Sequence, residues 1–179
     1  MKNNLGRKLN ANEEVRECVK HGTLAIGYIG IAECMKALFG KDHSQDDTVY
    51  SFAYSLVVRI NEFAKQATER HGLNFSAYAT PAESTCMTLR DKLYNQYGLL
   101  EGITDRAYIT NSHHVPVYNE ISIFKKIDLE APFSKLSTGG YIMYTELESM
   151  VSNNLNALEK IINYAMDKGV AYFALNFPI

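Results

Sequence analysis

The chain has 179 residues, of which 46% are hydrophobic and 21% charged, and its formal net charge is −2. These values are typical of one globular domain with a substantial core. The small net charge gives no electrostatic basis for nucleic-acid binding. No apolar run reaches the roughly 18 residues that a membrane-spanning helix needs, and the polar start lacks the apolar core of a secretory signal.

Three cysteines, Cys18, Cys34 and Cys86, make an odd number without a C-x-x-C pair. This pattern argues against a disulfide scaffold and against a cysteine-rich zinc site, and it suits the reducing cytosol. We therefore expect a cytoplasmic protein. Cys34 and Cys86 fall within helical patterns, and we interpret both as small buried hydrophobic residues.

The predicted elements alternate between strands and helices. In chain order, we expect a strand at 23–29, a helix at 31–39, a long helix whose apolar stripe runs from 49 to 67, a strand at 75–79, a helix at 81–97, a short strand at 108–111, a helix at 121–127, a strand at 141–146, a helix with inward residues from 151 to 165, and a strand at 170–177. Ser44 and Asp47 signal the start of the long helix, and Gly72 ends it. Pro132 is expected to break the chain after the helix at 121–127.

This alternation predicts an α/β fold with a mostly parallel five-stranded sheet, flanking helices and right-handed crossovers. We assign one domain over 1–179, with 1–21 as a frayed N-terminal segment. A complete eight-stranded barrel of this type usually needs about 250 residues. Five strands therefore suit either an open sheet or part of a larger barrel.

A strand that runs directly into a helix start is the most informative local feature. Thr80 is a suitable N-cap, Pro81 occupies the first helical position and Glu83 the third, which together make a capping box. A helix N-terminus just beyond a strand end is a place where an α/β protein can hold an anion.

Phosphate is the anion that this helix start suggests. The backbone N–H groups of Ala82, Glu83, Ser84 and Thr85, with the hydroxyls of Ser84 and Thr85, could hold it. The Glu83 carboxylate opposes phosphate unless the capping box turns it back toward the N-cap. An ordinary capped helix is the alternative, and the local pattern alone favours it.

A second candidate site is the loop Asn111, Ser112, His113 and His114, which follows a predicted strand end. Two adjacent histidines suggest a metal, but neighbours on an extended segment point in opposite directions. No carboxylate or cysteine has the spacing to complete a ligand set. We expect a loop that faces a ligand or satisfies the core, without metal. His113 is of a type that can act as general acid or base, although the sequence names no partner for it.

Other catalytic motifs are not apparent. Gly27-Tyr28-Ile29-Gly30 follows an apolar run but lacks the spacing of a dinucleotide-binding loop, and it indicates a close strand-to-helix turn. No pattern identifies a catalytic nucleophile.

Six segments together resemble the anaerobic, class III, ribonucleoside-triphosphate reductases. They are 26–33, 73–84, 104–117, 130–133, 139–144 and 176–179. Each is weak alone, but their common order makes the match specific. The resemblance implies a ten-stranded α/β barrel, of which this chain would be the later half, and a ribonucleoside triphosphate reduced at the 2′ carbon. It also implies that the turn 82–85 takes the substrate phosphates and that 111–114 lies near the barrel mouth.

The resemblance further implies cofactors that this chain would not hold. The family uses a glycyl radical, installed by an S-adenosylmethionine iron–sulfur activase, a thiyl cysteine on a loop inside the barrel, a four-cysteine zinc module and an N-terminal allosteric ATP-cone. The zinc module would begin near Ile179, and the thiyl cysteine would precede Gly22. We therefore expect no catalytic residue in this chain and no turnover by the chain alone.

Three hypotheses follow from this resemblance. The chain is part of a class III reductase that carries part of the substrate site, or it is a catalytically inactive relative that serves as a nucleotide-binding or assembly module, or it is a remnant without function. Neighbouring reading frames that supply the radical glycine and the thiyl cysteine would favour the first. Half a barrel exposes an apolar face and an unpaired edge. We therefore expect a homodimer or an assembly with the remaining reductase segments.

Overall fold

The computed structural model describes residues 10–16, 20–147 and 154–176. Its elements are β1 (Thr23–Tyr28), α2 (Ile31–Phe39), α3 (Asp47–His71), β2 (Asn74–Ala79), α4 (Glu83–Tyr97), α5 (Ile123–Ser134), β3 (Met143–Glu146), α6 (Leu155–Asp167) and β4 (Phe173–Asn176). None of the helices in these ranges is long and apolar enough to cross a membrane. The alternation confirms the mixed α/β class. The predictions for Cys18, Val151 and 177–179 lie outside the described residues.

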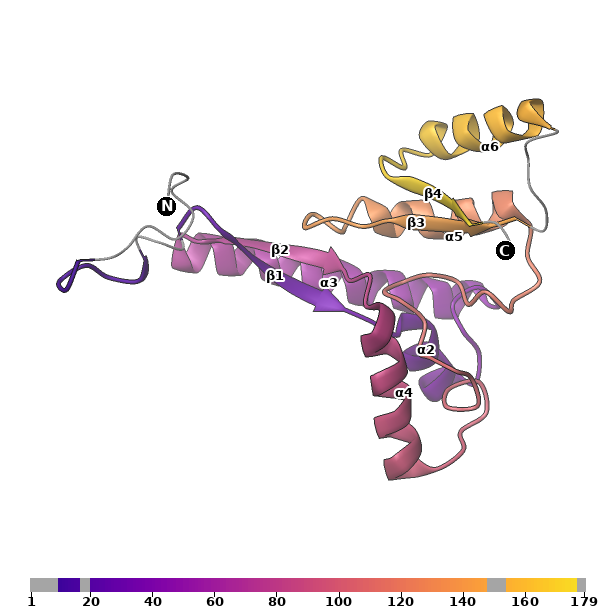
Figure 1. Cartoon of the computed structure of the whole chain (residues 1–179), viewed down its shortest axis with the longest axis horizontal. Coiled ribbons are helices and arrows are strands. Elements are labelled where there is room, and N and C mark those ends of the chain that lie inside the picture. Colours follow the sequence, from indigo (N-terminus) through magenta and orange to yellow (C-terminus); the bar gives the residue numbers. More distant parts are fainter. Residues whose placement is uncertain (1–9, 17–19, 148–153, 177–179) are drawn as a thin grey trace.

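The strands form two parallel pairs. β1 pairs with β2 from Thr23↔Asn74 onward, and β3 pairs with β4. The described part of the chain therefore has four strands in two small sheets, and the prediction of one five-stranded sheet was wrong in this respect. Figure 1 shows α3 along β1 and β2, and α5 and α6 beside β3 and β4.

The chain that leads into β3 runs along β2 and joins the two sheets. The Gly139 N–H donates to the Ala77 carbonyl at 2.6 Å, and the Ala79 N–H donates to the Gly140 carbonyl at 3.1 Å. A Cβ at Gly139 would lie 2.9 Å from the Ala77 carbonyl oxygen. This close approach explains why glycine stands there.

The segment 108–111, expected to be a short strand, is not one. The Thr110 N–H donates to the Glu33 carboxylate at 2.8 Å, and the Thr110 carbonyl accepts from the Gly30 N–H at 3.0 Å. The backbone of this segment therefore forms hydrogen bonds with residues at the start of α2, beyond the end of β1, instead of with a neighbouring strand. A long-range side-chain contact of this kind leaves no local signal in the sequence.

Helix α5 is longer than predicted. It runs to Ser134 and contains Pro132, which was expected to break the chain there. Proline removes only one helical hydrogen bond, and it lies here in the last turn. The neighbouring Ala131 and Phe133 are buried, so packing holds the turn in place.

Two groups of buried side chains stabilise the fold. The first joins β1, β2, α2, α3 and the end of α5, and consists of Tyr28, Ile31, Met35, Val49, Ala53, Val57, Ala79 and Phe133. The second joins α5, α6 and β3, and consists of Ile127, Ala131, Met143, Leu147, Ile161, Ala165 and Val170. Tyr141 packs against both groups.

Helix α4 projects away from these cores (Figure 1). Cys86 is its one buried residue, and Tyr97 at its end is exposed. Met87 and Tyr94 are exposed apolar residues on the same helix. The predicted homodimer or contact with further reductase segments stays a prediction.

Part of the N-terminal segment that was expected to be frayed contacts the body of the protein. The Arg16 guanidinium donates to the carbonyl of His71, at the end of α3.

Helix α3 begins two residues away from the predicted cap. Asp46 is the N-cap, and its Oδ1 accepts from the N–H groups of Thr48 at 2.9 Å and Val49 at 3.2 Å. Ser44, the predicted cap, instead binds Asp42.

Asp46→Ala is expected to lower the free energy of unfolding by about 1 kcal/mol, because two N–H groups of the first turn lose their acceptor. Urea denaturation followed by circular dichroism measures the change. Asp46→Ser should restore most of the loss, since serine is also a good N-cap. Asp47→Ala, which removes the same charge one residue along, should cost less. An equal loss for Asp46→Ala and Asp47→Ala would contradict the cap.

Candidate functional site

A cavity of about 310 Å³ lies where the carboxyl ends of several strands meet. Ligands of α/β proteins commonly bind at this edge of the sheet. The cavity is enclosed by the end of β2, the start of α4, the loop 108–118 and the ends of β3 and β4. Its lining residues are Pro81, Glu83, Cys86, Tyr108, Thr110, Asn111, His114, Val115, Val117, Tyr118, Lys126, Tyr144, Glu146 and Asn176.

The capping box predicted at the start of α4 does not form. The helix begins at Glu83, Ala82 is the N-cap and no side chain caps it. The Thr80 hydroxyl instead donates to the Tyr78 carbonyl at 3.4 Å. Glu83 has φ of 30°, a left-handed conformation that is uncommon for a residue with a side chain. Such conformations concentrate at functional sites.

Only part of the predicted phosphate-binding turn has free N–H groups. The Ala82 N–H donates to Asn111 Oδ1 at 2.8 Å, and the Thr85 N–H donates to the Ala82 carbonyl at 2.7 Å. Within the described ranges, the N–H groups of Glu83 and Ser84 have no acceptor. The side chains of Ser84 and Thr85 are exposed. Glu83 itself lines the cavity, and without a capping box its carboxylate is not held back toward the N-cap.

The predicted loop divides between the cavity and the core. Asn111 and His114 line the cavity, whereas Ser112 and His113 are buried outside its lining. Asn111 ties the loop to α4, because its Oδ1 accepts from both the Ala82 N–H and the Cys86 thiol. The adjacent histidines have different hydrogen-bond partners, but residues 112 and 113 form a turn rather than an extended segment, and the two rings lie side by side with centroids 5.5 Å apart.

His113 belongs to the core. Its Nδ1 lies 2.7 Å from the Tyr28 hydroxyl, and its ring stacks on Phe133 with centroids 5.0 Å apart. Burial, with the neighbouring His114, lowers the pKa of His113 to about 3, and burial raises the pKa of Tyr28 to about 12. Both groups are therefore neutral near pH 7, which does not suit His113 as a general acid or base.

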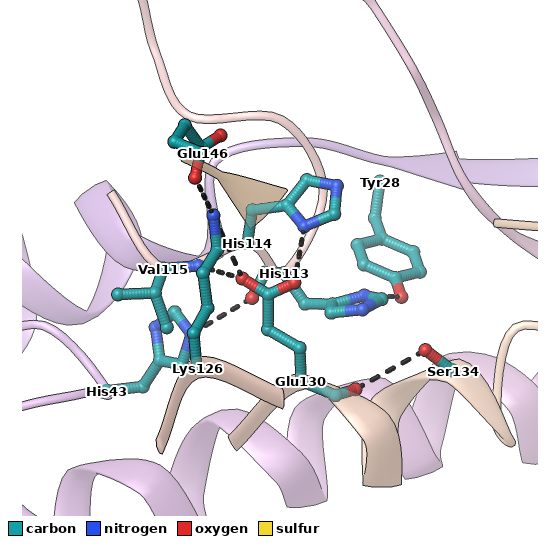
Figure 2. A network of polar contacts seen from close by, with 9 residues as sticks. All are labelled: Tyr28, His43, His113, His114, Val115, Lys126, Glu130, Ser134 and Glu146. Carbon is teal, nitrogen blue, oxygen red and sulfur yellow. Dashed lines mark hydrogen bonds and ion pairs between the residues drawn. The ribbon is translucent and has the colours of Figure 1, made fainter. Parts of the chain in front are cut away.

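His114 is held by a buried carboxylate. Its Nδ1 lies 2.8 Å from Glu130 Oε2, while Glu130 Oε1 accepts from the Val115 N–H at 2.8 Å (Figure 2). The Lys126 ammonium lies 4.0 Å from Glu130 Oε1 and 2.5 Å from Glu146 Oε2. Burial opposes the charge of Glu130, but His114 and Lys126 outweigh it and hold the pKa of Glu130 below its usual range. Glu130 is thus a charged group inside the protein, satisfied by several donors.

Sequence reasoning missed Lys126, Glu130 and Glu146. Lys126 lies in the predicted helix at 121–127, but Glu130 lies beyond it, and only the longer α5 places the two four residues apart on one helical face. One available signal was the position of Glu146 at the end of a predicted strand, where ligand-facing groups lie.

The described cysteines differ from each other. Cys86 is buried, as predicted, and it lines the cavity. Burial, with the nearby Glu33, raises the pKa of the Cys86 thiol. Cys34 is exposed, so its assignment to the core was wrong. In residues 10–16, 20–147 and 154–176, no three His, Cys, Asp or Glu side chains are grouped so that they could hold a metal ion.

Comparison with known proteins identifies relatives over the whole chain. The profile of the family described as anaerobic ribonucleoside-triphosphate reductase matches residues 1–179. The anaerobic ribonucleoside-triphosphate reductase of Escherichia coli K12 is 37% identical over 177 residues, which are 97% of this chain and 25% of that protein. The enzyme of the same name from Enterobacteria phage T4 is 37% identical over 176 residues, 97% of this chain and 27% of that protein.

Solved structures share the fold. An anaerobic ribonucleotide reductase superposes with a TM-score of 0.69 and 21% identity, over 86% of this chain and 24% of that one. The Thermotoga maritima anaerobic ribonucleotide reductase in complex with dATP and CTP gives 0.64 and 22%, over 84% and 25%. The chain thus spans about a quarter of the length of these relatives. These matches confirm the resemblance seen in the sequence.

Proposed function

The chain belongs to the anaerobic ribonucleoside-triphosphate reductase family, and we propose that it supplies one wall of the nucleotide-binding site of such a reductase. The complete enzyme would reduce ribonucleoside triphosphates to deoxyribonucleotides by glycyl and thiyl radical chemistry. The radical glycine, its activase, the thiyl cysteine and the structural zinc would be supplied from outside these 179 residues. The chain alone would bind nucleotide without turning it over.

The main evidence for this proposal is the cavity beside the start of α4. Glu83 and Ser84 offer two N–H groups that have no acceptor among the described residues, at the positive end of a helix of 15 residues. Unpaired N–H groups at such an end favour phosphate. The hydroxyls of Ser84 and Thr85 are exposed beside them. The triphosphate would lie at this edge, with the nucleoside directed into the cavity.

Nearby groups set the charge of the site. Glu83 and Glu146 line the cavity, and Lys126 is its one lining Lys or Arg residue in the described part of the chain. Lys126 is paired with Glu146, so it contributes little free charge. The phosphate would therefore depend on the backbone of α4 rather than on basic side chains, which predicts modest affinity for the isolated chain.

Titration calorimetry with CTP tests the phosphate position. The wild-type chain is expected to bind CTP, and Ser84→Asp to weaken binding at least tenfold, because a new negative charge next to phosphate costs more than about 1.4 kcal/mol. Asn95→Asp is the matched control, since it adds the same charge to an exposed position of the same helix. Position 95 lies eleven residues further along the helix, so its added charge would be about 16 Å from position 84 and largely screened.

Two results would contradict the proposal. Absence of binding by the wild-type chain at millimolar CTP, UTP, ATP and GTP would remove the nucleotide site from this chain. Equal weakening by Ser84→Asp and Asn95→Asp would show that the phosphates do not lie at the start of α4.

A further inference from the structure

The ring of His114 is oriented by Glu130, by Tyr144 and by His113, whose ring centroid lies 5.5 Å from its own. Glu130 Oε2 lies 2.8 Å from Nδ1, and the edge of the ring meets Tyr144, with centroids 5.8 Å apart. Because the carboxylate can only accept a hydrogen bond, Nδ1 must carry the proton in this pair. In the neutral ring, Nε2 is then an acceptor.

Nε2 of this ring has no partner in the part of the chain that the structure describes. Figure 2 shows the second ring nitrogen on the side away from Glu130, and within the described ranges no hydrogen bond is made to it. His114 lines the same cavity as Glu83, whose N–H lies at the start of α4. An oriented acceptor in a cavity is an arrangement that recognises a donor on a ligand.

The carboxylate that orients this ring is unusually well supported. Glu130 is 0% exposed and also accepts from the Val115 N–H, which belongs to the same loop as His114. Lys126 approaches its other oxygen from one turn earlier in α5. A carboxylate fixed in this way restricts both the tautomer and the rotation of the imidazole, as a third group does in other histidine sites.

We propose that His114 Nε2 accepts a hydrogen bond from a ribose hydroxyl of the bound nucleotide, and that Glu130 is the positioning residue for this contact. The proposal rests on the nucleotide site proposed above. The ribose is the group next to the phosphates, so phosphates at the start of α4 place it within the cavity that His114 lines. Hydroxyl recognition by an oriented acceptor would favour intact ribonucleotides over analogues that lack the hydroxyl.

Two amide substitutions separate the functions of the two ring nitrogens. The amide of His114→Asn can replace Nδ1 and keep the contact with Glu130, but nothing then occupies the position of Nε2. The longer His114→Gln places its amide near Nε2 and gives up the Nδ1 contact. CTP binding by His114→Asn should weaken about tenfold with an almost unchanged melting temperature. His114→Gln should melt lower yet bind CTP more tightly than His114→Asn.

Deoxy analogues show whether the lost contact is to a hydroxyl. CTP, 2′-deoxy-CTP and 3′-deoxy-CTP are titrated into the wild-type chain and into His114→Asn. For the analogue that lacks the recognised hydroxyl, the tenfold difference between the two proteins should disappear, as in a double-mutant cycle. UTP lacks the amino group of cytosine but has both ribose hydroxyls, so the tenfold difference in affinity between the wild-type chain and His114→Asn should remain for UTP. His71→Asn, the same change at an exposed position at the end of α3, should leave all affinities unchanged.

Nitrogen NMR of the imidazoles tests the positioning residue. In the wild-type chain, the His114 ring should show only the tautomer with the proton on Nδ1, and CTP should shift the Nε2 signal. Glu130→Gln should give a mixture of tautomers, because an amide can either accept or donate. A purely structural role of Glu130 would leave the tautomer unchanged.

The outcomes distinguish the two proposals. A wild-type chain that binds none of the four ribonucleoside triphosphates overturns the nucleotide site and the role of His114 together. CTP binding by the wild type with equal affinity for His114→Asn overturns the role of His114 alone. The same holds if the effect of His114→Asn is identical for CTP and for both deoxy analogues.

Discussion

Replacement of Phe133 by alanine is expected to lower the free energy of unfolding by about 3–5 kcal/mol, the usual cost of removing a buried aromatic ring. Phe133 is completely buried near the end of α5. Its ring stacks on His113 and meets the rings of His43, Tyr50 and Tyr54 edge-on. Alanine would leave a cavity at the point where α3, α5 and the 111–114 loop meet. Urea denaturation followed by circular dichroism measures the loss.

Two variants control for this change. Phe133→Leu retains most of the apolar volume and should cost less than Phe133→Ala. Phe63→Ala removes the same ring from a position that is 61% exposed on α3, and it should change stability by no more than about 0.5 kcal/mol. A loss below about 1 kcal/mol for Phe133→Ala would show that this ring is not central to the core.

Acidification from pH 7 to pH 3 is expected to cost about 4 kcal/mol of stability through His113 alone. The pKa of His113 falls from 6.5 to about 3 in the folded protein, first because of burial and then because of His114. Between these values the unfolded chain binds a proton that the folded chain does not. Stability is therefore highest above pH 6.5 and falls steadily toward pH 3.

Other buried groups act in the same direction. Burial lowers the pKa of His43, and the pKa of Glu130 is also lowered in the folded protein. A depressed carboxyl pKa contributes stability above its unfolded value, and this contribution is lost as the pH falls through the folded value. The decline should thus continue below pH 4.5.

Urea denaturation at a series of pH values measures this dependence. His113→Gln should flatten the slope between pH 6.5 and pH 3, whereas His71→Gln, at an exposed position at the end of α3, should leave it unchanged. A proton titration of His113 by NMR provides a direct check that does not depend on a variant. A midpoint near 6.5 for His113 would contradict the buried, neutral state.

Elements with strong local signals were predicted well from the sequence. The run at 23–29 corresponds to β1, 31–39 corresponds to α2, and 75–79 lies within β2. Each has a continuous apolar or 3.6-residue pattern, and glycines mark the turns beside them, such as Gly30 with φ of 78°. Such signals do not require knowledge of the tertiary structure.

The errors arose where distant residues compete for backbone groups. In the expected strand at 108–111, Thr110 donates to Glu33 and accepts from Gly30. At the expected cap, Asn111 in place of Thr80 accepts from the Ala82 N–H. Neither partner can be recognised from local propensity. In both cases a loop crosses the end of a strand and changes the pairing there.

Only part of the candidate site could be predicted from the sequence. Its position at the strand ends, and the loop with Asn111 and His114, follow from the alternation of strands and helices. The sequence did not distinguish His113 from His114, since only the fold places one against Phe133 and the other against Glu130.

The parallel strand pairs also determine how the chain must fold. Partners in β1 and β2, such as Thr23 and Asn74, are about fifty residues apart in sequence. The contact from Ala77 to Gly139 spans a still longer interval. Such pairings pay the entropy of loop closure before any strand gains its hydrogen bonds. Helices can form locally and early, whereas the strand ends around the cavity come together only after both of these long-range contacts have formed.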